Sequence, residues 1–315
     1  MSGLHQSHDV TLITENGQML AQNSDVQALG YQESSENSDT NTPAHSVRLP
    51  LTLKAYNRWS IEGLTVFYFC GQSMDDRLYA VEIQHTKSGG KAPLSKRPGL
   101  FLHDSPAISS PIVAAAADEE ISPNRYVARG PNSDIILVNT QNCNNDYNDV
   151  ATDVMRPRMT DGGKVAFSFQ VEVGAELEKR NDVFSWIQVA KKGEAGLDNG
   201  GFKLIRHPSK PKQLPEAVDD LFSPTRHWPA HDMCMEDEIL AFLSNGKRWQ
   251  LSSWKHMFTI QFTDEDVLRR MEDSLARMIL VTAARLRYLS ATGRTSESGL
   301  VAASRKRTSQ LYSGT

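Results

Sequence analysis

Side chains of the types that bind metal ions gather in one polar segment of the sequence, RHWPAHDMCMEDE at 226–238. Five of its residues carry a nitrogen, sulfur or carboxylate ligand: His227, His231, Asp232, Cys234 and Glu236. Their spacing matches no common zinc pattern, and no fourth ligand stands out for a tetrahedral site. We therefore predict no metal and no cofactor, and we interpret the segment as a polar loop whose Trp228 packs into the end of the domain.

A second group of side chains is basic and suits phosphate binding. The segment HTKSGGKAPLSKRPG at 85–99 combines four cations with a Gly-Gly pair, and RHPSKPK at 206–212 holds a second set. Lys and Arg pair with phosphate, and Gly lets backbone N–H groups approach it. The candidate residues for an anionic ligand are Lys87, Lys91, Lys96, Arg97, Lys210 and Lys212. The ordinary alternative is that both segments are solvated loops.

Sequence patterns that identify enzymes are absent. The chain contains no Gly-x-Ser-x-Gly motif. The glycine pairs at 89–90, 162–163 and 200–201 fit neither a P-loop nor a dinucleotide fingerprint. Cys70 ends an apolar segment, which indicates an inert core thiol rather than a reactive thiolate. We predict no catalytic residue and a protein that is not an enzyme; an unidentified enzyme is the less favoured alternative.

Composition and charge narrow the class of protein. The chain has 315 residues, a net charge of −4 and three widely spaced cysteines, so neither nucleic-acid binding nor a disulfide framework is expected. The start of the chain does not read as a secretory signal. The most apolar window, 271–289, holds five charged residues, each costing roughly 2.5–3.5 kcal/mol at a bilayer centre, so no transmembrane segment is expected. These features favour a cytoplasmic protein.

The sequence divides into two tails and one domain. Residues 1–47 are polar and acidic, and 291–315 are polar with a basic cluster at 305–307, so both are expected to be disordered. The domain, 48–290, carries long polar insertions at 118–132, 141–153 and 208–235. About a dozen of its segments have the alternation or the composition of β-strands. They are 50–56, 64–71, 77–84, 99–104, 110–117, 133–140, 164–173, 183–190, 201–207, 238–244, 248–253 and 256–262.

One helix is expected to end the domain, over 264–290. Thr263 or Asp264 could cap it, and neither Gly nor Pro occurs between residue 267 and Gly293. It is apolar nearly all round, which predicts burial on several sides. Arg277 interrupts this surface and must either meet a carboxylate inside the barrel that the strands would form or reach a rim or pocket; a structural partner is favoured over a ligand contact. A mostly β, α+β fold follows, in which about twelve antiparallel strands form a barrel around the helix.

Four stretches resemble the tubby C-terminal-like superfamily, which includes tubby, LURP-one-related proteins and phospholipid scramblases. They are LYAVEIQ at 78–84, RPGLFLHDSPAISSPIVAAA at 97–116, VFSWIQVAKKGEAGLDNGGFKLIRH at 183–207 and DEILAFLS at 237–244. The likeness is closest to fungal tubby-like proteins. It implies a twelve-stranded barrel around a central hydrophobic helix and, because tubby proteins bind phosphoinositides, an anionic lipid ligand.

Two functions follow as expectations. The first is a non-enzymatic binding module that engages a phosphoinositide or another anionic ligand through basic loops at the barrel rim, with peripheral attachment to membranes. The second is an interaction or scaffold protein without a lipid ligand, whose insertions and tails recruit protein partners.

Overall fold

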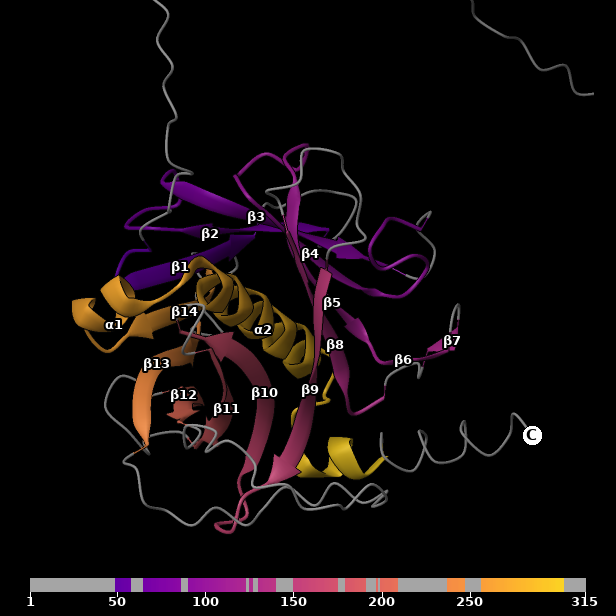
Figure 1. Ribbon diagram of the computed structural model, residues 1–315, viewed down its shortest axis with the longest axis vertical. Coiled ribbons are helices and arrows are strands. Elements are labelled where there is room, and N and C mark those ends of the chain that lie inside the picture. Colours follow the sequence, from indigo (N-terminus) through magenta and orange to yellow (C-terminus); the bar gives the residue numbers. More distant parts are fainter. Residues whose placement is uncertain are drawn as a thin grey trace, which may run out of the picture. The chain divides into compact units, whose positions relative to one another are not determined.

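Twelve antiparallel strands form a closed barrel in the computed structural model (Figure 1). The structure describes residues 49–57, 65–85, 90–122, 125–126, 130–139, 150–174, 179–190, 197, 199–208, 237–246 and 256–302. The barrel strands are β1 (Thr52–Asn57), β2 (Val66–Cys70), β3 (Arg77–Gln84), β4 (Gly99–His103), β5 (Ile112–Asp118), β8 (Ser133–Val138), β9 (Val150–Met159), β10 (Val165–Val173), β11 (Arg180–Val189), β12 (Gly201–His207), β13 (Glu238–Asn245) and β14 (His256–Phe262). Neighbouring strands are consecutive along the chain, except that β5 pairs with β8 and β1 closes the barrel against β14. A small ribbon of β6 (Glu120–Ser122) and β7 (Arg125–Tyr126) leaves the barrel between β5 and β8.

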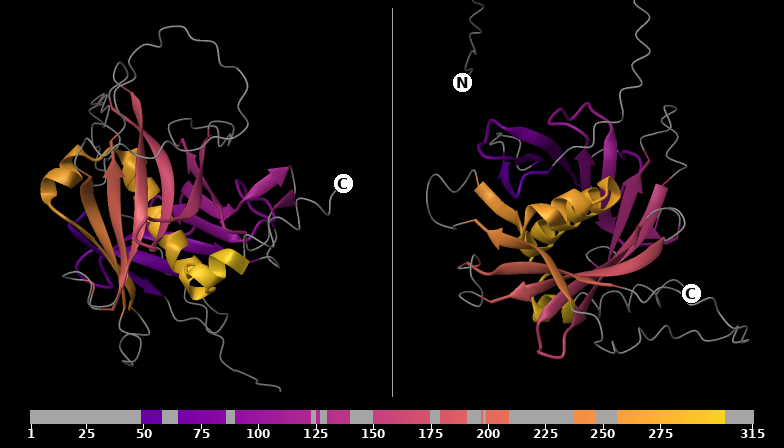
Figure 2. Two further views of the ribbon diagram at one scale, coloured as in Figure 1. Left: turned by 90° about the horizontal axis from the view of Figure 1, so that it is seen from below. Right: turned by 60° about the vertical axis from the view of Figure 1, so that its left-hand side comes forward.

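The chain then enters the barrel as a helix, which confirms the predicted fold class. Asp264 caps α1 (Glu265–Arg270) by accepting a hydrogen bond from the Val267 backbone N–H at 2.7 Å. After an extended residue at Met271, α2 (Asp273–Ala291) runs through the interior (Figure 2). The expected single helix is therefore two helices joined at 271–272. No helix in the described part of the chain has the length and apolarity needed to cross a membrane.

The barrel interior is filled by the inward residues of the strands and by α2. β10 shows the alternation most clearly, because Val165, Phe167, Phe169, Val171 and Val173 are all buried. On α2 an unbroken run from 278 to 286 is buried, as expected for a helix surrounded by sheet. A hydrogen bond joins the barrel wall to α2 at the centre of the core. The indole N–H of Trp186 donates to the Thr282 hydroxyl at 3.0 Å.

The strand predictions hold wherever the structure describes the chain, but three strands were not predicted: β9, and the short β6 and β7, which fall in the predicted insertion 118–132. The expected strand 248–253 lies outside the described residues, as does the expected insertion 208–235 apart from its first residue. β9 was missed, and its first residues fall in the predicted insertion 141–153. Its sequence, VATDVMRPRM, buries only Met155 and contains Pro157, so it has neither the alternation nor the composition of an interior strand.

The described chain continues past the predicted end of the domain at 290. Gly293 adopts φ +72°, and the backbone N–H groups of Gly293 and Arg294 donate back to Ser290 and Leu289. These two bonds form a Schellman motif, which ends α2 and turns the chain sharply. As a result Arg294 and Thr295 are buried again at the end of the barrel.

Candidate functional site

The barrel wall separates between β9 and β10. These strands pair only where 156–159 face 165–168, next to the hairpin that joins them. Beyond that point, 150–155 pair with β8 alone and 169–173 pair with β11 alone. Two sheet edges therefore diverge around an opening, and we call the space between them the β9–β10 cleft.

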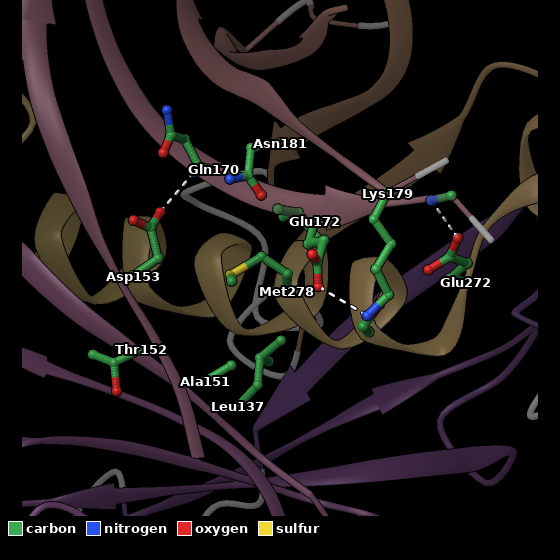
Figure 3. Close-up of a pocket in the computed structure, with 13 residues that line it drawn as sticks. Leu137, Ala151, Thr152, Asp153, Gln170, Glu172, Lys179, Asn181, Glu272 and Met278 are labelled. Carbon is green, nitrogen blue, oxygen red and sulfur yellow. Dashed lines mark hydrogen bonds and ion pairs between the residues drawn. The ribbon is translucent and has the colours of Figure 1, made fainter. Parts of the chain in front are cut away.

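The β9–β10 cleft has a volume of about 440 Å³ and reaches the central helix (Figure 3). Its apolar surface includes Leu137 of β8, Val171 of β10 and the buried Met278 of α2. Its charged residues are Asp153, Glu172, Lys179 and Glu272. Three carboxylates against one ammonium leave an excess of two negative charges, so the cleft favours a cationic ligand over an anionic one.

Two of these carboxylates bind backbone groups along the unpaired edge of β10. The Gln170 N–H donates to Asp153 Oδ2 at 2.6 Å, and the Gly174 N–H donates to Glu272 Oε1 at 2.9 Å (Figure 3). Backbone groups two residues apart point to the same side of a strand. The N–H of Glu172, which lies between the two capped positions, therefore also faces the cleft.

The third carboxylate is paired with the lysine at the cleft rim. Lys179 Nζ lies 3.3 Å from Glu172 Oε2, and both side chains are about half exposed. An exposed pair of this kind is worth at most about 1 kcal/mol, so an incoming ligand can exchange it at little cost.

The basic residues predicted to bind an anion differ in their surroundings. Lys96 is exposed. Lys91 lies 2.7 Å from Glu82 and over the Phe101 ring, so it is already paired within the domain. Lys87, Lys210 and Lys212 lie outside the described residues.

Arg97, also in the predicted anion-binding set, lies inside the domain. Its Nη1 lies 2.6 Å from Asp134 Oδ2 and also donates to the Asp118 carbonyl at 3.3 Å. Glu120 lies 3.5 Å from the other nitrogen, and Arg97 is only 6% exposed. Its charge is therefore used inside the domain, where it secures the start of the β6–β7 excursion. It has no free face for a ligand.

The residues considered for metal binding, His227, His231 and Cys234, lie outside the described residues. Within the described ranges no group of three or more His, Cys, Asp or Glu side chains could hold a metal ion. Cys70 is fully buried, as predicted, and burial raises the pKa of its thiol to about 11.

Arg277, which interrupts the apolar surface of α2 in the sequence, is not the most deeply buried charged residue of this helix. Arg277 is a quarter exposed and lies 3.8 Å from Asp104, which fits the structural partner rather than a ligand pocket. Arg285 is fully buried instead. Its Nη2 lies 2.6 Å from Asp118 Oδ1, and its Nε donates to the Ser133 hydroxyl. Arg294 binds the same carboxylate oxygen at 2.9 Å. The burial of Arg285 could have been predicted from the sequence, because position 285 falls on the apolar stripe of the helix.

A polar relay, which no sequence motif indicated, crosses the outer face of β10, β11 and β12. Asp237 lies 2.7 Å from His207 Nδ1, and His207 Nε2 lies 3.2 Å from the Ser185 hydroxyl. Ser185 lies 2.9 Å from Ser168, and the Arg158 guanidinium donates to both hydroxyls. The order Asp–His–Ser is that of a hydrolase triad. Ser185 is fully buried, however, so no substrate reaches its hydroxyl, and we interpret the relay as a cross-strand lock.

Comparison with known proteins assigns no family to the chain. No protein-family model, no curated protein and no solved structure matches it. The geometry of the barrel and its cleft is therefore the basis for assigning a function.

Proposed function

We propose that the chain is a non-enzymatic binding module and that its ligand binds in the β9–β10 cleft. The observation that carries the proposal is the separation of β9 from β10, which opens the barrel wall down to Met278 of the central helix. A volume of about 440 Å³ lies within the range of ligand sites, and the lining, in which polar residues outnumber apolar ones, suits a polar or charged ligand.

The charge of the cleft favours a protein partner over an anionic lipid. Asp153, Glu172 and Glu272 would repel a phosphate-bearing headgroup. This supports the second expectation from the sequence, an interaction protein. The phosphoinositide proposal now depends on Lys96 together with Lys87, Lys210 and Lys212. Membership of the tubby C-terminal-like superfamily and a cytoplasmic location are likewise proposals; a barrel around a hydrophobic helix supports the first.

A photo-crosslinking pair tests the site. Benzoylphenylalanine replaces Thr152, which lines the cleft, or Lys164, which is exposed in the hairpin at the opposite end of the same two strands. After irradiation in cells, we expect one discrete crosslinked species from the Thr152 variant and none from the Lys164 variant. Equal crosslinking at both positions, or none at Thr152, would contradict a ligand in the cleft.

Vesicle sedimentation tests the lipid proposal separately. The full chain and a Lys96→Glu, Lys210→Glu, Lys212→Glu variant are mixed with phosphatidylcholine vesicles with and without phosphatidylinositol bisphosphate. We expect no difference between the two vesicle types. Pelleting that requires the phosphoinositide and is lost in the variant would restore the anionic-ligand function.

A further inference from the structure

Resting on the proposed function, we infer that the ligand of the β9–β10 cleft is an extended, basic segment of a partner protein that adds to the free edge of β10 as an extra strand. The inference rests on one observation: the unpaired edge of β10 lies inside an acidic cleft. A closed barrel ordinarily removes the edges that other chains can pair with. Here the edge of β10 from Gln170 to its end at Val173, and Gly174 just beyond it, is free of β9, because β9 pairs with β10 only from residue 156 onward.

The edge presents backbone groups at the spacing that a strand requires. The N–H groups of Gln170 and Glu172 face the cleft about 6.6 Å apart, the repeat of alternate residues in a strand, and the N–H of Gly174 follows in the bend after β10. Together they span about 13 Å, which suits a partner segment of four or five residues. Addition of a strand to an exposed edge is a recurrent mode of peptide recognition.

The two carboxylate caps occupy the places that carbonyl groups of an added strand would take. Asp153 Oδ2 and Glu272 Oε1 accept from the first and last of the three N–H groups. Both are side chains and can rotate away while the backbone of β10 stays in place; because the short Asp153 side chain reaches Gln170 directly, residues 150–155 of β9 must also move outward to admit a strand beside Gln170. A peptide that displaces them exchanges hydrogen bonds one for one and leaves two carboxylates beside it in need of partners.

Those freed carboxylates define the chemistry of the peptide. Lys or Arg side chains would pair with Asp153 and Glu272, and Glu172 points outward on the same edge, half exposed. The buried Val171 and Met278 lie on the inner side of the cleft. Since side chains of a strand alternate between its two faces, the peptide should alternate basic residues with apolar ones.

The chain's own basic cluster, at 305–307, follows three to five positions after the last described residue, which limits how far it can extend from there. The described chain continues past the C-terminal end of α2, whereas Glu272 and Ser274, at the N-terminal end of this helix, line the cleft. The 19 residues of α2 span about 28 Å. Five residues beyond 302 cover at most about 18 Å. A partner chain, rather than the tail, is therefore the occupant.

The test uses the full chain and the fluorescein-labelled peptide Lys-Val-Lys-Val-Lys-Val-Lys. Fluorescence anisotropy compares it with an analogue that is N-methylated at every residue and with one that has Glu in place of Lys. We expect binding of the first peptide, at least tenfold weaker binding of the methylated analogue, which keeps the charge but lacks N–H donors, and no binding of the acidic analogue. Equal affinity for the methylated analogue would overturn strand addition.

Two substitutions of Glu172 distinguish the contribution of the backbone N–H to peptide binding from that of the side-chain charge. Glu172→Pro removes an N–H that faces the cleft and not β11, so the ladder to β11 is kept; Glu172→Gln keeps the N–H and removes the charge. We expect at least tenfold weaker peptide binding for the proline variant and less than about threefold for the glutamine variant, at unchanged melting temperature. Similar losses in both would contradict pairing with the edge.

Amide resonances of the unmodified protein give a readout that depends on no variant. Addition of the basic peptide should shift the ¹⁵N–¹H signals of Gln170, Glu172 and Gly174 and slow their hydrogen exchange. Unchanged signals at all three would overturn the inference even if the peptide binds. Crosslinking at Thr152 without peptide binding would reject the strand-adding partner while the proposed binding site stands. Tighter binding of the chain's own segment 303–315, with concentration-dependent self-association, would replace the foreign partner by a second copy.

Discussion

Arg285 on the central helix and Asp118 at the end of β5 form an ion pair of 2.6 Å with neither side chain accessible to solvent. Arg294, returned to the barrel by the turn after α2, binds the same carboxylate. Burial lowers the pKa of Arg285, and the charge of Asp118 opposes that shift. One carboxylate therefore compensates two buried guanidinium groups and ties the C-terminal end of the helix to the barrel wall.

Replacing Asp118 should be among the most damaging polar substitutions in the chain. Asp118→Ala leaves two buried cations without their counter-charge, and we expect a loss of about 3–5 kcal/mol in the free energy of unfolding. The matched control is Asp104→Ala, whose 3.8 Å pair with Arg277 is part-exposed and should cost less than about 1 kcal/mol. Urea denaturation measures both. Equal losses of unfolding free energy in Asp118→Ala and Asp104→Ala would mean that the buried pair contributes no more than the part-exposed one.

The central helix should not tolerate a buried charge. Leu280 is fully buried between the strands, so Leu280→Asp places an unpaired carboxylate in the core, and we expect loss of the whole fold rather than fraying of one end. Circular dichroism melting gives the measurement. Ala291→Asp, exposed at the end of the same helix, should cost less than about 1 kcal/mol. A near-normal melting temperature for Leu280→Asp would contradict the packing described for α2.

Stability should fall in acid partly through Glu82. Its hydrogen bond to the buried His103 and its pair with Lys91 lower the pKa of Glu82 from 4.5 to about 2. Because the folded value is the lower one, this stabilisation is complete above about pH 5 and is lost as the pH falls toward 2. With 30% of the side chain exposed, we expect about 1–2 kcal/mol.

Glu82→Gln isolates that contribution. The variant should be less stable than the parent at pH 7 and should approach it near pH 2–3, which flattens the acid limb of the stability curve. Glu172→Gln, in an exposed pair, serves as the control and should leave the curve unchanged. An acid limb in Glu82→Gln as steep as that of the parent would rule out Glu82 as its source.

The polar relay should stabilise the sheet without reacting. We expect no labelling of Ser185 by a fluorophosphonate probe, because its hydroxyl is buried. His207→Phe removes the hydrogen bonds to Asp237 and Ser185 and should cost about 1–2 kcal/mol of stability. Mass spectrometry of the probe-treated chain is the check. Labelling of Ser185 or Ser168 that requires His207 would instead indicate a hydrolase.

Local patterns were enough to predict the barrel, and they failed at the cleft. The alternation in β10 and the all-round apolar surface of α2 each report on burial, so strands and helix could be located from single segments. β9 could not, because a strand that borders an opening buries little more than Met155 and shows no alternation. The insertion predicted at 141–153 thus concealed Asp153, one of the two residues that cap the edge of β10.

The remainder of the site depends on contacts between distant segments. Asp153, Gly174 and Glu272 come together only when three parts of the chain meet at one end of the barrel. Arg97 illustrates the same dependence on distant contacts. A cation beside glycines looked available, yet Asp134, 37 positions further along the chain, neutralises it inside the domain. Charge type was visible in the sequence, whereas the partner of each charge was not.

The break at 271–272 also has a consequence for the motions of the central helix. Glu272 occupies the N-cap position of α2, but its carboxylate accepts from Gly174 and makes no capping bond to the helix. The first turn of α2 therefore has backbone donors without a side-chain acceptor, in a region where the wall is open, while the other end is fastened by Asp118 and the Schellman turn. Protection against amide exchange should consequently be graded along α2, lowest beside the cleft and highest from the middle of the helix to Arg285.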